Sequence, residues 1–214
     1  MDNIIEVKHL SKEFKETLAL QDVSITFEKN KIHGIVGRNG SGKTVLFKCI
    51  CGLMYPDKGE VVVRGKIVGK DVDIPVGIGS IIEAPGFLPN YSGMKNLQFL
   101  AGINRKIDKN RIAESMKLVG LDFESKKHVG KYSLGMRQRL GLAQAIMEYP
   151  DILILDEPMN GLDNDGVNEI RELLLQLKSS GTTILLASHN RMDIDILCDT
   201  IHEMDKGGLI KSNV

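Results

Sequence analysis

Short apolar runs alternate along this chain with stretches in which apolar side chains recur at helical spacing. Four runs are apolar almost throughout, as is typical of strands buried on both faces of a sheet; they cover residues 61–63, 77–82, 152–155 and 183–187. Strands that alternate with helices predict an α/β fold with a mostly parallel core sheet and crossover helices.

Three apolar stripes predict helices, formed by Val45, Leu46, Cys49, Ile50 and Leu53, by Ile112, Met116 and Val119, and by Val167, Ile170, Leu174 and Leu177. Asp108 is placed to cap the second helix, and Gly120 and Gly181 are placed to end the second and third. Residues 87–149 are mostly helical in pattern and lack clear strands. We therefore expect a single domain over residues 1–214, with an inserted helical subdomain at about 87–149.

The composition suits one cytosolic domain. The 214 residues are 42% apolar, and 28 basic side chains balance 28 acidic ones, so no global field favours nucleic acid or an acidic membrane. No apolar run approaches the roughly 20 residues that span a bilayer. Asp2 and Glu6 make the first residues unlike a secretory signal. The three cysteines form no disulfide framework, and we interpret Cys49 and Cys51 as packing residues.

Residues 37–44 match the phosphate-binding pattern GxxxxGK[ST], between the apolar strand 32–36 and the stripe that starts at Val45. The glycines let backbone N–H groups surround phosphates, and the following helix adds its positive end. Lys43 would reach the β- and γ-phosphates, and the Thr44 hydroxyl would ligate Mg²⁺. A chance glycine-rich turn is the alternative. The expected nucleotide contacts in the loop are Gly37, Asn39, Gly40, Ser41, Gly42, Lys43 and Thr44.

The apolar strand 152–155 ends in two adjacent carboxylates, Asp156 and Glu157. Alone, this could be a strand followed by a solvated acidic turn. Beside a phosphate-binding loop, it predicts that Asp156 holds Mg²⁺ through water and that Glu157 acts as general base on the attacking water.

The segment Ser133-Leu-Gly135-Met-Arg-Gln138 resembles the signature motif of ABC ATPases. A serine hydroxyl, a glycine N–H and a helix N-terminus can together bind one anion. An ordinary helix start capped by Ser133 is the alternative, but the segment lies just upstream of the acidic strand, where this family has its signature.

Further matches follow the order of the ABC family. Residues 160–163 resemble the D-loop, with Asp163 as a nucleotide-site residue, and Ser188-His189 resembles the switch histidine. Phe14 has the position of the aromatic side chain that stacks on adenine. A lone histidine after a strand, or a lone phenylalanine in a polar segment, is more often structural; His9, His33, His128 and His202 match no motif.

One position departs from the family pattern. Most members have a glutamine that touches Mg²⁺ and the attacking water where this chain has Glu83, and a glutamate there resembles ATPases that serve bacitracin and lantibiotic resistance transporters. We expect Glu83 to be a metal-site residue, unless it is a solvated loop carboxylate.

The resemblance implies a P-loop NTPase of ABC type, with an antiparallel β region near the N-terminus beside the core sheet. It also implies that ATP, with Mg²⁺, lies between two such domains, in a homodimer or pseudo-dimer. A separate membrane permease would be the partner, with the chain at the cytoplasmic face of the membrane and no nucleic-acid partner. An ABC sensor, and an ABC ATPase without a transport role, remain as alternatives.

Overall fold

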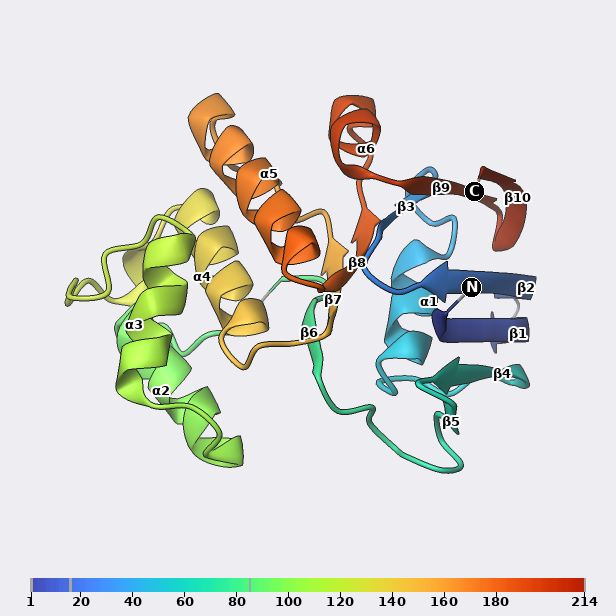
Figure 1. The fold of residues 1–214 in the computed structure, drawn as a ribbon, viewed down its shortest axis with the longest axis horizontal. Coiled ribbons are helices and arrows are strands. Elements are labelled where there is room, and N and C mark those ends of the chain that lie inside the picture. Colours follow the sequence, from blue (N-terminus) through green and yellow to red (C-terminus); the bar gives the residue numbers. More distant parts are fainter. Residues whose placement is uncertain (1, 16, 85, 214) are drawn as a thin grey trace.

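The computed structural model of the chain describes residues 2–15, 17–84 and 86–213. It consists of strands and helices, and Figure 1 shows their arrangement. The strands are β1 (Asn3–Phe14), β2 (Thr17–Glu28), β3 (Ile32–Val36), β4 (Lys58–Val63), β5 (Lys66–Ile67), β6 (Ile78–Ile81), β7 (Ile152–Asp156), β8 (Thr183–Ala187), β9 (Thr200–Asp205) and β10 (Gly208–Asn213). The helices are α1 (Lys43–Ile50), α2 (Gly93–Asn104), α3 (Lys109–Leu118), α4 (Leu134–Ile146), α5 (Asn164–Ser179), α6 (Arg191–Leu197) and the 3₁₀ turn η1 (Val129–Lys131).

The strands form two sheets. The core sheet has the order β10-β9-β3-β8-β7-β6, and its strands are parallel except for the pair of β9 and β10. The second sheet, β2-β1-β4-β5, is antiparallel. The expected α/β architecture, with a mostly parallel core and an antiparallel region near the N-terminus, is confirmed.

Strands β7 and β8 are buried on both faces, as their apolar runs predict. Ile152, Ile154 and Leu185 pack with α1 and the antiparallel sheet in one apolar cluster. The alternate side chains Leu153 and Leu155 join a second cluster that includes α4 and α5. Because side chains alternate along a strand, the core sheet separates two hydrophobic cores.

Helices α2, α3 and α4 lie on the side of the core sheet opposite α1 (Figure 1). Between Phe87 and Tyr149 the described residues form helices and one isolated bridge, Ser92 to His128, but no strand. Asp108 caps α3 by accepting a hydrogen bond from Arg111 N, as expected. The helical content of this segment agrees with the prediction, whereas its independence as a subdomain stays a prediction.

The first predicted stripe extends three residues past the end of its helix. Helix α1 ends at Ile50, and the side chain of Leu53 lies outside it, 59% exposed. Gly52 adopts a positive φ of 73° and turns the chain, and Asp73 O lies so close that a Cβ there would approach it to 2.1 Å. Cys49 and Cys51 are buried as predicted, and burial raises their thiol pKa values to about 11 and about 12.

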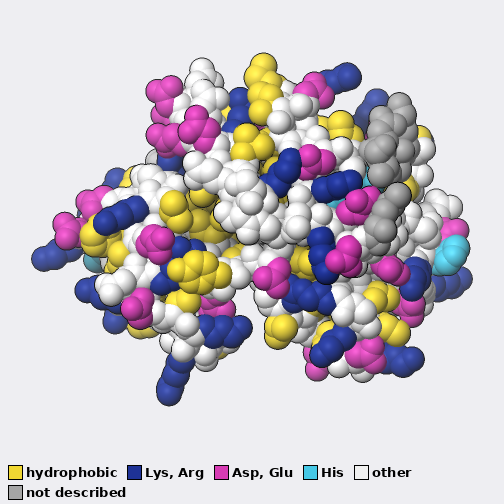
Figure 2. Space-filling model, in the orientation of Figure 1, with side chains coloured by type: hydrophobic (Ala, Val, Ile, Leu, Met, Phe, Trp, Pro, Cys, Tyr) yellow, Lys and Arg dark blue, Asp and Glu magenta, His cyan; other side chains and the backbone are white. Residues whose placement is uncertain are grey.

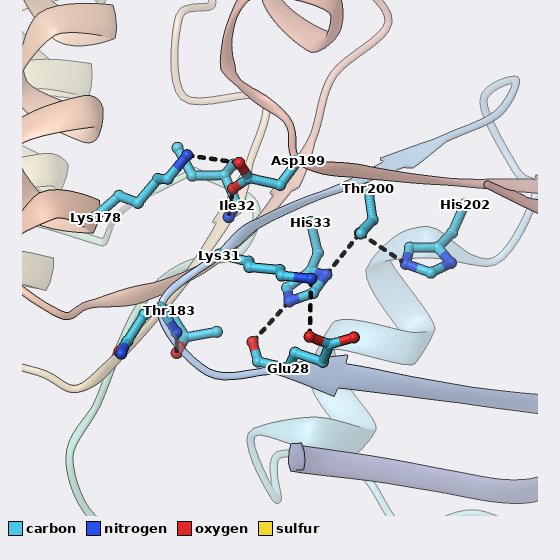
Figure 3. A network of polar contacts seen from close by, with 10 residues as sticks. Glu28, Lys31, Ile32, His33, Lys178, Thr183, Asp199, Thr200 and His202 are labelled. Carbon is cyan, nitrogen blue, oxygen red and sulfur yellow. Dashed lines mark hydrogen bonds and ion pairs between the residues drawn. The ribbon is translucent and has the colours of Figure 1, made fainter. Parts of the chain in front are cut away.

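A buried polar network joins β3 to β9 (Figure 3). His33 Nδ1 lies 2.6 Å from Thr200 Oγ1, which lies 3.2 Å from His202 Nε2, and His33 Nε2 lies 2.8 Å from Glu28 O. The two rings pack edge-on against Phe27. Burial lowers the pKa of both imidazoles, that of His202 to about 4. These histidines are structural, as expected for residues that match no motif.

Side chains of both charges are interspersed over the face shown in Figure 2, without a large area of one sign. This distribution agrees with the balanced composition. None of the helices in the described part of the chain combines the length and the apolar character that crossing a membrane requires.

Candidate functional site

Three loops with predicted chemistry meet at one edge of the core sheet. Strand β8 lies between β3 and β7 and is parallel to both, with Ala187 opposite Ile35 on one side and Asp156 on the other. The carboxyl ends of adjacent parallel strands meet at the same edge, where α/β folds bind ligands. The sheet order therefore brings together the phosphate loop (37–44), the carboxylates after β7 and the histidine after β8.

The phosphate loop is wrapped tightly around its own lysine. The Lys43 ammonium donates to Gly37 O at 2.7 Å and to Arg38 O at 3.1 Å, and Lys43 is 7% exposed. Gly42 has φ +103°, and a Cβ there would lie 2.5 Å from Ala19 O of β2, so only glycine fits.

Ser41 places a buried hydroxyl inside the phosphate loop. Its hydroxyl is buried and, in the part of the chain that the structure describes, bonds to no protein group. A buried polar atom without a partner is costly unless a ligand or water satisfies it. Together with the buried Lys43 ammonium, it fits a loop that binds an anion such as a triphosphate.

The predicted metal residues meet across the sheet edge. Thr44, in the first turn of α1, donates from Oγ1 to Asp156 Oδ2 at 2.6 Å. Hydroxyl and carboxylate oxygens are the hard ligands that Mg²⁺ binds, often through water. The two residues thus fit the expected Mg²⁺ site.

Glu157 and His189 form a direct pair. Glu157 Oε2 lies 2.8 Å from His189 Nδ1, and Glu157 N donates to Ala187 O at 2.9 Å. The Glu157 backbone has a positive φ of 53°, a strained conformation of a kind that clusters at functional sites. The side chain of Glu157 is 26% exposed and that of His189 is 71% exposed, so the carboxylate remains open to water.

The signature segment (133–138) lies away from the phosphate loop. Ser133 caps α4 by accepting from Met136 N at 3.1 Å, and it lines a groove with Gly135, Gly161 and Asp163. Gly135 packs so closely that a Cβ there would lie 2.8 Å from Gly161 O. A different groove contains Gly37, Arg38 and His189. Figure 1 shows α4 and α1 on opposite sides of β6, β7 and β8.

The remaining predicted nucleotide contacts lie on several different elements. Gln138 donates from Nε2 to Glu157 O at 3.2 Å, so it links the signature helix to the acidic strand end. Phe14 ends β1 and is 41% exposed, and its ring centroid lies 5.6 Å from the Lys12 ammonium. Asp163 caps α5 by accepting from Gly166 N, and Asn39 and Gly40 are exposed in the phosphate loop.

Glu83 follows β6 and is paired with a residue that the sequence analysis missed. Its Oε1 lies 2.7 Å from the Lys48 ammonium, and its backbone has a positive φ of 63°. Lys48 lies four residues after Thr44 on α1, and residues at this spacing share one face of a helix. That spacing places Lys48 on the Thr44 face of α1, but it does not identify Glu83 as its partner.

Similarity to known proteins extends over nearly the whole chain. Residues 20–160 match the family model "ABC transporter". The uncharacterized ABC transporter ATP-binding protein YybJ of Bacillus subtilis is 45% identical over 206 residues, covering 96% of this chain and 94% of that protein. The bacitracin transport ATP-binding protein BcrA of Enterococcus faecalis is 41% identical over 213 residues, covering 99% of this chain and 69% of that protein.

The fold is also similar to solved structures. The dimeric structure of MJ0796, a bacterial ABC transporter cassette, superimposes with a TM-score of 0.89 at 22% identity, covering 98% of this chain and 97% of that one. Sequence match, fold and loop geometry agree, and the chain belongs to the ABC transporter family, as an ATP-binding and ATP-hydrolysing subunit.

Proposed function

We propose that this ATPase powers a transporter that removes a peptide antibiotic of the bacitracin or lantibiotic type through a separate membrane permease. The observation that carries the cargo assignment is the 41% identity, over 99% of the chain, with a bacitracin transport ATP-binding protein. Glu83 supports the same subgroup, because it stands where most ABC ATPases have glutamine.

The residues at the sheet edge have distinct roles in this proposal. The phosphate loop and Lys43 bind the triphosphate, and Thr44 and Asp156 hold Mg²⁺, which when bound neutralises charge on the β- and γ-phosphate oxygens. Phe14 stacks on the adenine. The close contact of Glu157 Oε2 with His189 Nδ1 supports Glu157 as the base that accepts a proton from water, while His189 orients that carboxylate.

Two chains complete each site. The signature segment and Asp163 line a groove separate from that of the phosphate loop, so one chain's signature segment contacts the nucleotide held by the other chain. Ser133, Gly135 and Gln138 then approach the γ-phosphate only when the dimer closes, and closure excludes water from the reaction. The partner is a second copy or a related subunit. Closure drives the permease, which holds the ATPase at the cytoplasmic face of the membrane.

A complementation experiment tests transport and hydrolysis together. Deleting the gene should sensitise cells to bacitracin or a lantibiotic, and the wild-type chain should restore resistance and co-purify from membranes with a multispan protein. Glu157→Gln should bind ATP and the permease but lose roughly 10²- to 10⁴-fold in turnover, because it lacks the general base, and should restore no resistance.

Glu172→Gln is the matched control, since Glu172 is an exposed carboxylate on α5. Unchanged sensitivity in the deletion strain would refute the cargo assignment. Near-normal ATPase activity in Glu157→Gln would remove this residue from its role. A deletion strain that still exports the antibiotic but no longer induces resistance would instead indicate that the protein acts in a sensor.

A further inference from the structure

The Ser188 hydroxyl makes two hydrogen bonds to residues that follow His189. Ser188 follows β8, is 3% exposed, and accepts from Asn190 N at 3.1 Å. The same hydroxyl donates to Asp193 Oδ2 at 3.3 Å. A serine side chain that bonds the N–H two residues later restricts the backbone of the intervening residue, and that residue is His189.

Asp193 joins this turn to a neighbouring helix. It lies on α6 with a 2% exposed side chain, and its Oδ1 accepts from Arg171 Nε at 3.0 Å and also from Arg171 Nη2. The Arg171 side chain, on α5, is 12% exposed. A buried ion pair of this kind adds little net stability compared with an apolar pair, but its two-pronged geometry fixes where the carboxylate lies.

Helix α5 extends this connection to the loop at residues 160–163. Asp163 caps the helix, and Arg171 lies eight residues later, about 12 Å along the axis at 1.5 Å per residue. Gly161 of that loop also contacts the signature segment, since a Cβ on Gly135 would lie 2.8 Å from Gly161 O. A rigid helix therefore spans from the signature groove to the histidine turn.

We propose that Arg171, Asp193 and Ser188 are positioning residues that hold His189 against Glu157 and link its position to the loop at 160–163. None of the three touches the Glu157 carboxylate; each acts through the next. The proposal rests on the proposed role of Glu157 and His189 in hydrolysis.

Ser188→Ala tests the proposal with little risk to the fold, because the Arg171–Asp193 pair stays in place. We expect kcat for ATP hydrolysis to fall about tenfold, the scale of one lost hydrogen bond to a charged group, while KM for ATP changes little and the chain stays folded. Ser115→Ala is the matched control, since Ser115 is also a buried serine, its hydroxyl donates to Ile112 O within α3, and it should keep wild-type kcat.

Histidine-selective ¹⁵N NMR gives a second readout that does not depend on turnover. The His189 ring signals, identified by their loss in His189→Ala, should shift in Ser188→Ala in the same direction as in Glu157→Gln, and should stay in place in Ser115→Ala. Unchanged ring signals or unchanged kcat in Ser188→Ala would overturn the relay. Retained turnover in Glu157→Gln would instead overturn the proposed function, so the two failures are distinguishable.

Discussion

The carboxylate of Glu83 pairs with a lysine that lies one turn along α1 from the proposed metal residue Thr44. Thr44 contacts Asp156, and one turn further along α1 Lys48 pairs with Glu83 at 2.7 Å. A third carboxylate beside a triphosphate, Asp156 and Glu157 is costly unless a cation neutralises it. The Lys48 ammonium supplies a cation in this arrangement, in which the Glu83 side chain is 64% exposed. That Glu83 moves onto Mg²⁺ only in the Mg-ATP state stays a hypothesis.

Glu83→Gln should therefore separate hydrolysis from transport. We expect ATP binding within a few-fold of wild type and persistent basal ATPase activity, but reduced resistance in cells, because glutamine cannot exchange one cation for another. Glu83→Ala should raise the Mg²⁺ concentration for half-maximal ATPase activity, and Lys48→Met should lower it, since Glu83 then has no competing cation. ATPase activity titrated with Mg²⁺ measures both effects.

Glu60→Gln is the matched control, because Glu60 also pairs with a lysine, Lys8, at 3.5 Å but on the antiparallel sheet. If Glu83→Gln, Glu83→Ala and Lys48→Met all match wild type in Mg²⁺ dependence and in cellular resistance, Glu83 is a bystander of the reaction.

At the scale of elements, the pairing of β3 with β9 depends on neutral histidines. The pKa of His202 is lowered from 6.5 to about 4 and that of His33 is lowered, in both cases mainly by burial. Glu28, Lys31 and Asp199 surround the network (Figure 3). In the unfolded chain these imidazoles take up protons near pH 6.5, whereas in the fold they resist protonation.

Stability should therefore be fully present above about pH 6.5 and be lost as the pH falls towards about 4, because the unfolded state binds more protons in this window. Urea unfolding at several pH values measures this loss. His202→Gln should lower the free energy of unfolding at pH 7. It should also flatten the pH dependence of that free energy between about pH 4 and pH 6.5. His9→Gln is the control, since His9 is exposed and pairs with Asp22 at the surface. If the free energy of unfolding has the same slope against pH in His202→Gln as in wild type, this pH dependence does not come from His202.

At the scale of the whole molecule, the phosphate loop and the signature segment lie in separate grooves. We therefore predict that no single chain contains a complete ATPase site and that two chains share each one. In a heterodimer of Lys43→Ala and Ser133→Arg chains, one site has both defects, while the other has an intact phosphate loop and an intact signature segment. ATPase activity should be nearly absent in each mutant alone and should return on mixing, which a coupled-enzyme assay measures.

Mixing Lys43→Ala with a chain that carries both substitutions is the control, because no intact phosphate loop is then present. Activity that stays absent in proven heterodimers of the two single mutants, or that each mutant retains alone, would argue against a shared site.

The parts of the site that the sequence determined are local. The phosphate loop needs contiguous residues at fixed spacing, so residues 37–44 could be predicted from the motif and from the strand and helix on either side of it. The uninterrupted apolar runs of β7 and β8 determined that these strands are buried on both faces, since no amphipathic pattern marks a solvent side. Asp108 as the cap of α3 was also predictable from local sequence, because a cap contacts the first turn of its own helix.

Contacts between distant segments were decided only by the tertiary structure. The pairs of Glu157 with His189, Glu83 with Lys48, and Arg171 with Asp193 each join two elements. The first forms because β7 and β8 are neighbours in the core sheet, and the third because α5 packs beside α6. Strand order and helix packing depend on the fit of whole apolar faces, which no local spacing encodes. The Leu53 prediction failed for a related reason: its helical spacing continues past Gly52, where a close approach of another segment turns the chain.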